Sequence, residues 1–253
     1  MIRIYRIQDG ASSRYVAERE GQWHAIDGDV FGAFTEGAAI APEGLQFLAP
    51  VSPSKIVCVG LNYRDHALEV GKPLPAEPLL FMKPSTSVIG PGAAIENPLW
   101  AGRIDHEAEL GIVIKKRAFQ VPLGQANDYI LGLTCVNDVT ARALQQKDGQ
   151  YTRAKGFDTF APIGPCIAVG LDGRDLQVRG YVNGNLRQDS RTRELIFTIP
   201  ELVTYITSIM TLLPGDIIST GTPSGIGPIV PGDTVTVHVE GIGALTNTVV
   251  ARG

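Results

Sequence analysis

Residues 103–114 read RIDHEAELGIVI, and this stretch carries the strongest information about the fold. Side chains of a strand point to alternate faces, so Asp105, Glu107 and Glu109 would share one face. The other face has the pattern of a strand packed on a hydrophobic core, and it holds His106, Ala108, Leu110, Ile112 and Ile114. The stretch is therefore predicted to be one strand that enters the interior with acidic side chains at its start.

Two neighbouring carboxylates at the boundary of a core are costly. Glu107 and Glu109 would repel each other there, and loss of water would raise the cost further. A divalent cation bound between them would remove this cost. The alternative is a solvated edge face with unpaired acids, and an E-x-E pattern alone does not exclude it. A third ligand is needed to decide.

Asp138 is the candidate for that third ligand, because it ends the apolar run LGLTCVND. A carboxylate at the end of a strand can point into a site. The alternative is an N-cap aspartate for the helix predicted in TARALQQKDG, and the local sequence does not separate the two. Three carboxylates would favour Mg²⁺, with Mn²⁺ or Ca²⁺ as alternatives, over Zn²⁺.

The rest of the chain is dominated by strand-like runs. After residue 50 they are KIVCVG, LLFMK, AELGIVI, YILGLTCVND, CIAVG, VRGYVNG, DIIST and TVTVHVE. Two stretches are predicted to be helical. TARALQQKDG has Gly149 placed to end it, and TIPELVTYITSIMTLL begins with a capping box of Thr198 and Glu201. Its apolar residues repeat at helical spacing as far as Leu213. Because there is no regular βαβ alternation, the fold class is predicted to be α+β and β-rich.

The first fifty residues differ from the remainder. The short alternating runs IRIYRI, SRYVAE and WHAID are separated by QDG, EGQ and DGD, which predicts a small antiparallel sheet with hairpins. APEGLQFLAPVSPS is rich in proline and turn formers, as a connector would be. The chain is therefore predicted to have a small N-terminal β domain in residues 1–50 and a larger domain in residues 51–253.

Composition excludes several classes of protein. Hydrophobic residues make up 44% and charged residues 19%, so a large core is expected. The net charge is −4 and there is no run of Lys or Arg, so nucleic acid is not an expected partner. No apolar run is long enough to span a membrane, and no signal-like segment opens the chain, so a cytoplasmic location is expected. The three scattered cysteines are expected to be buried, reduced thiols.

Further candidate groups are His66, Glu69 and Lys155. Glu69 follows His66 by three residues, one helical turn, so its carboxylate can orient the imidazole and raise its basicity, as a general base requires. The alternative for His66 is an exposed residue in a polar turn. Lys155 lies between aromatic residues in YTRAKGFDTFAP, where it is either solvated or holds an anionic substrate group.

The glycine-rich loop GTPSGIG matches none of the nucleotide-binding or serine-hydrolase patterns. It could bring backbone N–H groups and Thr222 to a carboxylate.

Eight segments, taken together in chain order, resemble the fumarylacetoacetate hydrolase family. They are VGLNYRDHALE, EPLLFMKPSTSVIGPG, DHEAELGIVI, VNDVTAR, RAKGFDTFAPIGP, VNGNLRQ, IFTIPELVTYIT and LLPGDIISTGTPSGIGP. The resemblance implies a mixed β-sandwich or β-roll catalytic domain in a homodimer, with Mg²⁺ or Mn²⁺ as cofactor. The first 50 residues resemble, less specifically, the small extra domain of some bacterial members.

The resemblance also assigns roles to individual residues. It implies that Glu107, Glu109 and Asp138 bind the metal, and that His66 and Glu69 activate a water molecule.

Four further residues match positions that contact the substrate. Lys155 matches the family's substrate-binding lysine, and Arg142, Gln145 and Thr222 match positions that line the pocket of related acylpyruvases.

The activity implied by the resemblance is hydrolysis of a C–C bond in a small 2-oxo acid, namely a 2,4-dioxo acid such as fumarylpyruvate. Isomerisation of 2-hydroxyhepta-2,4-diene-1,7-dioate, decarboxylation of its tricarboxylate precursor 5-oxopent-3-ene-1,2,5-tricarboxylate, and decarboxylation of oxaloacetate use the same kind of metal site and stay open. A non-catalytic metal-binding protein is the alternative from another class.

Overall fold

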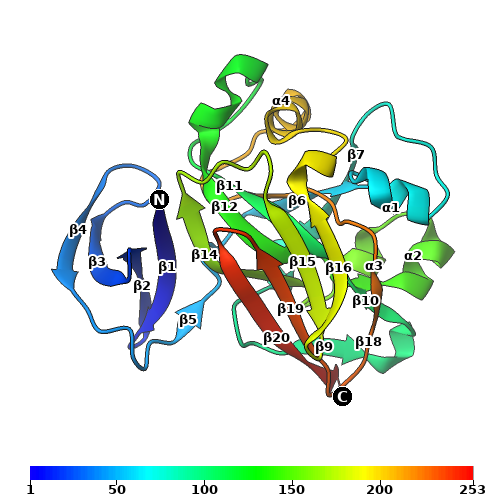
Figure 1. The fold of residues 1–253 in the computed structure, drawn as a ribbon, viewed down its shortest axis with the longest axis horizontal. Helices are drawn as coiled ribbons and strands as arrows, with labels where there is room; N and C mark the ends of the chain where they lie inside the picture. The colour runs from blue at the N-terminus through cyan, green and yellow to red at the C-terminus, as the bar shows by residue number, and fades with distance from the viewer. Residues whose placement is uncertain (253) are drawn as a thin grey trace.

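The computed structural model describes residues 1–252, which form three β-sheets with helices around them (Figure 1). The largest sheet runs in the order β4 (Phe34–Ala39), β3 (Gln22–Gly28), β2 (Ser12–Arg19), β1 (Ile2–Asp9), β14 (Ala161–Val169), β12 (Ile130–Asn137), β11 (Ala108–Ile114), β17 (Ile217–Ser219), β6 (Lys55–Gly60) and β7 (Leu79–Pro84). Two short strands join it from the side, β5 (Phe47–Leu48) on β1 and β8 (Val88–Ile89) on β14.

Two smaller sheets complete the β structure. A five-stranded sheet has the order β16 (Asn185–Arg191), β15 (Gln177–Val182), β19 (Thr234–Val239), β20 (Gly243–Arg252) and β9 (Ile95–Pro98). A three-stranded sheet has the order β13 (Thr140–Ala141), β10 (Ile104–His106) and β18 (Gly227–Ile229). All eight strand-like runs predicted after residue 50 are strands, so the prediction of a β-rich α+β fold is confirmed.

The helices are few and short. They are α1 (Arg64–Glu69), α2 (Arg142–Asp148), α3 (Thr152–Lys155) and α4 (Ile199–Ile209), and four 3₁₀ segments are Ser85–Ser87, Leu99–Ala101, Leu123–Tyr129 and Thr192–Glu194. Helix α2 ends as predicted at Gly149, which has a positive φ of 69° that suits glycine. His66 lies on the short helix α1, one turn before Glu69.

Helix α4 begins as predicted and ends earlier than predicted. The capping box of Thr198 and Glu201 is present. The helix stops at Ile209, whose side chain is 55% exposed, and Leu213 lies beyond the helix end. The helical periodicity therefore predicted the buried face correctly only as far as Ile206, which is fully buried.

The N-terminal strands form the predicted hairpins, and they also join the large sheet. Strand β1 pairs with β14 through Ile2↔Val169 and Ile4↔Ile167. In Figure 1, β1–β4 (blue) lie at one end of the molecule, apart from the five-stranded sheet. The sheet therefore continues across the predicted boundary at residue 50, and the division into two domains stays a prediction.

Strand β11 lies in the middle of the protein and is buried along its whole length. Leu110 and Ile112 belong to a core cluster with Val178 and Val237 of the five-stranded sheet, whereas Val113 belongs to the cluster on the opposite side of the large sheet. Both faces of β11 are therefore covered. Burial of each such leucine or isoleucine side chain contributes about 1.5–3 kcal/mol.

The prediction of one continuous strand over residues 103–114 is wrong in one respect. The strand is interrupted at Glu107, with β10 in the three-stranded sheet before it and β11 in the large sheet after it. The connection that follows β12 is similar, because Asp138 lies between β12 of the large sheet and β13 of the three-stranded sheet. Two of the predicted ligands thus lie where the chain passes from one sheet to another.

The three cysteines are free and buried, as predicted. Within residues 1–252, every helix is too short or too polar to cross a membrane.

A buried carboxylate at the start of β17 gives the first testable prediction. Asp216 is fully buried and accepts hydrogen bonds from Lys55 Nζ (2.7 Å), Ser54 Oγ (2.7 Å) and the Leu213 amide (2.8 Å). Burial alone would raise the pKa of Asp216, but Lys55 and these donors outweigh it and lower the pKa. Asp216→Asn is expected to reduce the free energy of unfolding at pH 7 by about 2 kcal/mol.

The pH dependence of this loss has a definite sign. Because folding lowers the pKa of Asp216, its stabilising contribution is present above the unfolded pKa of about 4 and is lost as the pH falls through the folded value. Urea unfolding at pH 7 and pH 3 should therefore show a deficit that shrinks at pH 3. Asp172→Asn, in an exposed pair with Arg174, is the control and should change little. Equal deficits at both pH values would contradict the prediction.

Candidate metal centre

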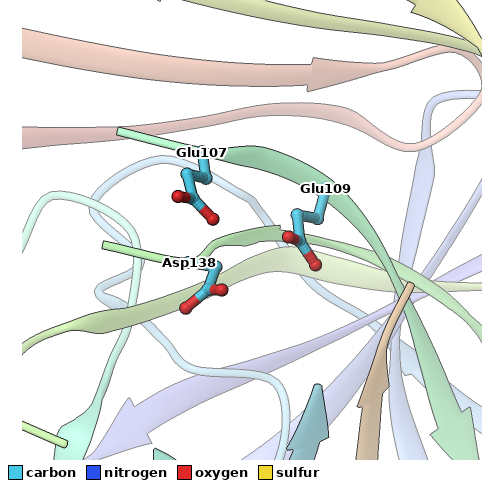
Figure 2. A group of neighbouring side chains, drawn as sticks. All are labelled: Glu107, Glu109 and Asp138. Carbon is cyan, nitrogen blue, oxygen red and sulfur yellow. The ribbon is translucent and has the colours of Figure 1, made fainter. Parts of the chain in front are cut away.

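Glu107, Glu109 and Asp138 converge, as predicted, on one point in the interior (Figure 2). One carboxylate oxygen from each lies within 4.8 Å of the others, and all three residues are buried. The antiparallel register of β11 and β12, with Ala108 opposite Asn137, brings the two strand ends together. A solvated edge face is therefore wrong as an explanation of these acids.

The backbone around the acids is fixed by hydrogen bonds. The Asp138 amide donates to the Glu107 carbonyl (2.9 Å), and the Glu107 amide donates to Asn137 Oδ1 (3.0 Å). Helix α2 starts at Arg142 with Ala141 as its N-cap, so Asp138 is not an N-cap residue. The side chain of Asp138 is thus left to point toward Glu107 and Glu109 (Figure 2).

Two cationic side chains contact the acids directly. Lys155 Nζ lies 2.9 Å from Glu107 Oε2 and 2.5 Å from Asp138 Oδ2. The Arg142 guanidinium pairs with the other oxygen of Glu107. Lys155 is almost completely buried, so the alternative of a solvated lysine is wrong.

A third cation, Lys83, was not predicted. Its Nζ lies 2.8 Å from Asp138 Oδ1, but it donates its hydrogen bonds to three backbone carbonyls, those of Val139 (2.9 Å), Lys155 (2.9 Å) and Phe160 (2.7 Å). An ammonium has three N–H groups, so none remains for Asp138. Asp138 Oδ1 is therefore a buried carboxylate oxygen that accepts no hydrogen bond from any residue in the range 1–252.

The residues fit a divalent cation. Asp138 Oδ1 accepts no hydrogen bond within residues 1–252, although the Lys83 ammonium lies 2.8 Å from it, and a bound ion would satisfy this oxygen. The donor set contains only carboxylates, which suits Mg²⁺ or Mn²⁺.

The three carboxylates differ in their electrostatic surroundings. Burial opposes ionisation of Glu107, but the charges of Lys155 and Arg142 outweigh it and hold the pKa of Glu107 well below its usual range. Burial, together with the charges of Asp138 and Glu107, raises the pKa of Glu109 to about 8. Ser219 Oγ (2.5 Å) and the Gly221 amide (2.9 Å) donate to Glu109, yet neither carries a charge. Glu109 is thus the acid that most needs a cation.

His66 and Glu69 form the predicted pair on α1. His66 Nδ1 lies 2.8 Å from Glu69 Oε2, and the Gly225 amide donates to the other oxygen of Glu69 (2.9 Å). With Nδ1 engaged by a carboxylate, Nε2 is the nitrogen left to act as a base. The side chain of His66 is only 12% exposed, so the alternative of an exposed polar turn is wrong.

One cavity of about 300 Å³ brings the predicted residues together. Its lining includes His66, Glu107, Glu109, Asp138, Arg142, Gln145, Lys155 and Thr222. Glu69 does not line the cavity and instead contacts His66. The lining also contains Phe81 and Tyr151, which form an edge-to-face aromatic pair and were not predicted. The sequence around these two aromatic residues does not indicate that they line the same cavity as the acids.

The three predicted pocket residues already have partners within the protein. Arg142 Nη1 donates to Gln145 Oε1 (2.5 Å). The Thr222 hydroxyl donates to the Ala108 carbonyl (3.0 Å), so its single proton is not free for a substrate. The substrate-binding roles of Arg142, Gln145 and Thr222 stay predictions.

Two residues of the first quoted stretch are accounted for. Asp105 accepts hydrogen bonds from Arg103 Nε (2.6 Å) and Arg142 Nε (2.9 Å), so it positions Arg142 and lies outside the acid cluster. His106 is buried, and its Nδ1 lies 3.1 Å from Gln188 Oε1. Its Nε2 has no partner among residues 1–252, so only one of its two ring nitrogens is hydrogen-bonded.

Comparison with known protein families gives a consistent result. A family model described as "Fumarylacetoacetate (FAA) hydrolase C-terminal" matches residues 55–250. The mitochondrial oxaloacetate tautomerase fahd2 of Xenopus laevis is 38% identical over 224 residues, which cover 83% of this chain and 70% of that protein.

Two solved structures show how far the likeness extends. The 2-hydroxyhepta-2,4-diene-1,7-dioate isomerase from Mycobacterium marinum is 42% identical with a TM-score of 0.93, and the match covers 100% of both chains. The maleylpyruvate hydrolase from Sphingobium sp. SYK-6, solved with a manganese(II) ion and pyruvate, is 27% identical with a TM-score of 0.82, covering 99% of this chain and 100% of that one.

Proposed function

Because the chain belongs to the fumarylacetoacetate hydrolase family, we propose that it is a divalent-metal-dependent enzyme that hydrolyses a C–C bond in a 2,4-dioxo acid of the acylpyruvate class. The observation that carries the proposal is the hydrogen-bonded pair of His66 and Glu69, whose imidazole lines the same cavity as the three carboxylates. Hydrolysis needs such a base beside the metal site to deprotonate water. An isomerisation by proton transfer can use the same pair, so the substrate panel below decides between the two reactions.

Glu107, Glu109 and Asp138 would hold Mg²⁺ or Mn²⁺, which when bound would polarise the 2-oxo group and stabilise the negative charge that develops on the pyruvate part. The chain supplies the proton transfers. His66 Nε2 takes a proton from a water molecule, and Glu69 fixes the imidazole tautomer and stabilises the imidazolium that results.

The rest of the reaction follows from this step. The hydroxide attacks the distal carbonyl carbon, and the bond between that carbon and the CH₂ of the pyruvate part breaks. The electron pair of the broken bond stays on the pyruvate part, which takes up the proton held by His66. The products are a carboxylic acid and pyruvate. The cavity volume of about 300 Å³ suits a substrate of this size.

A substrate panel tests the proposal. The protein is incubated with Mg²⁺ or Mn²⁺ and with fumarylpyruvate, acetylpyruvate, oxaloacetate or 2-hydroxyhepta-2,4-diene-1,7-dioate. We expect the ultraviolet absorbance of an acylpyruvate to disappear while pyruvate and the matching carboxylic acid form in equal amounts. Tight Mn²⁺ binding without turnover of any of these acids would instead support a non-catalytic metal-binding protein.

A second candidate function is isomerisation or tautomerisation of a 2-oxo acid on the same site. The similarity to the Mycobacterium marinum isomerase and to the Xenopus laevis tautomerase favours it. Decarboxylation of oxaloacetate or of 5-oxopent-3-ene-1,2,5-tricarboxylate is a third. The same panel, extended with this tricarboxylate, separates them, because isomerisation changes absorbance without releasing pyruvate and decarboxylation releases CO₂. The homodimer and the cytoplasmic location expected from the sequence remain proposals.

A further inference from the structure

We propose that Gln188 is a positioning residue. Its side chain holds both the interruption between β10 and β11, where Glu107 lies, and the loop that supports the His66–Glu69 pair. The proposal deepens the proposed function, since it concerns the same metal site and the same base. Gln188 lies in β16, and its side chain is fully buried. It belongs neither to the acid cluster nor to the cavity lining, so it would act only through the residues it contacts.

Every hydrogen-bonding group of the Gln188 side chain has a partner. Its Oε1 accepts from the Ala108 amide (2.9 Å) and lies 3.1 Å from His106 Nδ1. Its Nε2 donates to Thr222 Oγ1 (2.7 Å) and to the Pro223 carbonyl (2.8 Å). A side-chain amide has two acceptor lone pairs and two N–H groups, and all four are engaged.

The orientation of this amide is fixed by its partners. The Ala108 amide can only donate, so oxygen must face it, and the Pro223 carbonyl can only accept, so nitrogen must face that side. His106 Nδ1 must then carry a proton to donate to Oε1. No flipped amide satisfies these partners.

The oxygen end of Gln188 holds the two neighbours of Glu107. His106 ends β10 and Ala108 starts β11, so both residues that flank the interruption bind the same oxygen. The backbone of Glu107 itself is held by Asn137 and Asp138. Gln188 therefore sets the path by which the chain presents the Glu107 carboxylate.

The nitrogen end holds the loop that supports Glu69. Thr222 also donates to the Ala108 carbonyl, which closes a ring of hydrogen bonds with Gln188. Three residues later, Gly225 packs so closely on the strand of Gln188 that a Cβ there would lie 2.0 Å from the Arg187 carbonyl oxygen. The amide of this same Gly225 donates to Glu69 Oε1. The position of Glu69, and through it of His66, thus depends on this loop.

The test compares Gln188→Leu with the wild type and with Asn247→Leu as a matched control. Asn247 is another buried amide, in β20, which donates to the carbonyls of Gly90 and Ala93 away from the acids. The first readout is the dissociation constant for Mn²⁺, measured from the electron paramagnetic resonance signal of free Mn²⁺. We expect Gln188→Leu to raise it about 10- to 100-fold. Asn247→Leu should leave it within about 2-fold.

The second readout is a double-mutant cycle on kcat. Gln188→Leu and Glu69→Gln are expected to lower kcat by less in combination than the product of their separate effects, because both act through the position of His66. Gln188→Asn keeps the donor and the acceptor on a shorter side chain, and it should raise the Mn²⁺ dissociation constant less than Leu does. If the Leu variant does not fold, the Mn²⁺ dissociation constant of Gln188→Asn provides the test.

An unchanged Mn²⁺ dissociation constant in both Gln188 variants, or an equal rise in the Asn247 variant, would overturn the proposal. So would strictly multiplicative effects on kcat. Mn²⁺ binding does not depend on the reaction. If the wild type turned over no 2,4-dioxo acid while the Gln188 variants still bound Mn²⁺ more weakly, the proposed function would fail and the coupling of Gln188 to the metal site would stand.

Discussion

Glu109→Gln is expected to abolish measurable Mn²⁺ binding and turnover while leaving the metal-free protein at least as stable as the wild type. The two effects have opposite signs because Glu109 is buried beside Asp138 and Glu107, with only uncharged donors of its own. Its charge is useful to a cation and unfavourable without one. An isosteric amide removes the cost of burying this carboxylate or of protonating it at pH 7, and the gain in free energy of unfolding is on the order of 2 kcal/mol.

The measurements for this variant are isothermal titration with Mn²⁺ and urea unfolding in the presence of a chelator. Asp138→Asn is the informative comparison, because Asp138 pairs with buried Lys155 and its loss leaves that ammonium with one partner fewer. We expect this variant to lose Mn²⁺ binding and also about 3 kcal/mol of stability. A Glu109→Gln protein that unfolds far more easily than the wild type would show that Glu109 is mainly a structural residue.

His66→Ala is expected to lower kcat by about 10²- to 10⁴-fold while the Mn²⁺ dissociation constant stays the same. His66 is held by Glu69 and lines the cavity, but it contributes no atom to the acid cluster. A substitution at His66 should therefore remove the base without weakening metal binding. Steady-state kinetics on the best acylpyruvate, together with Mn²⁺ titration, measure the two properties on one preparation.

His24→Ala is the control for the histidine substitution, since His24 lies in β3 of the N-terminal hairpins. It should leave both values unchanged. If His66→Ala retained the wild-type kcat for hydrolysis, another group would have to activate the water. If it retained isomerisation but lost hydrolysis, the protein would catalyse both reactions and only hydrolysis would need the base.

The acid cluster could be predicted from sequence because its members follow local rules. Glu107 and Glu109 are two residues apart at the start of a strand, and Asp138 ends the neighbouring strand. The pair of His66 and Glu69 also has a local spacing, that of one helical turn. These patterns indicated candidates, and the family resemblance then selected among the alternatives for each.

The supporting residues could not be predicted in this way. Lys83 ends an apolar run in LLFMKP, where a lysine usually reaches solvent. Its three carbonyl partners lie 56, 72 and 77 residues further along the chain, so only the fold reveals them. The interruption at Glu107 was missed for a similar reason, because the alternating pattern continues through it while the partner strands change.

The three cations around the acids have a consequence for folding. Lys83, Arg142 and Lys155 reach the carboxylates from segments that are distant in the sequence, so the cluster forms only when those segments dock. Contacts of this kind form late and slowly. The acid cluster therefore has its own counter-charges within the chain. We expect the chain to fold in the presence of a chelator, unlike a zinc finger, which is unfolded without its metal.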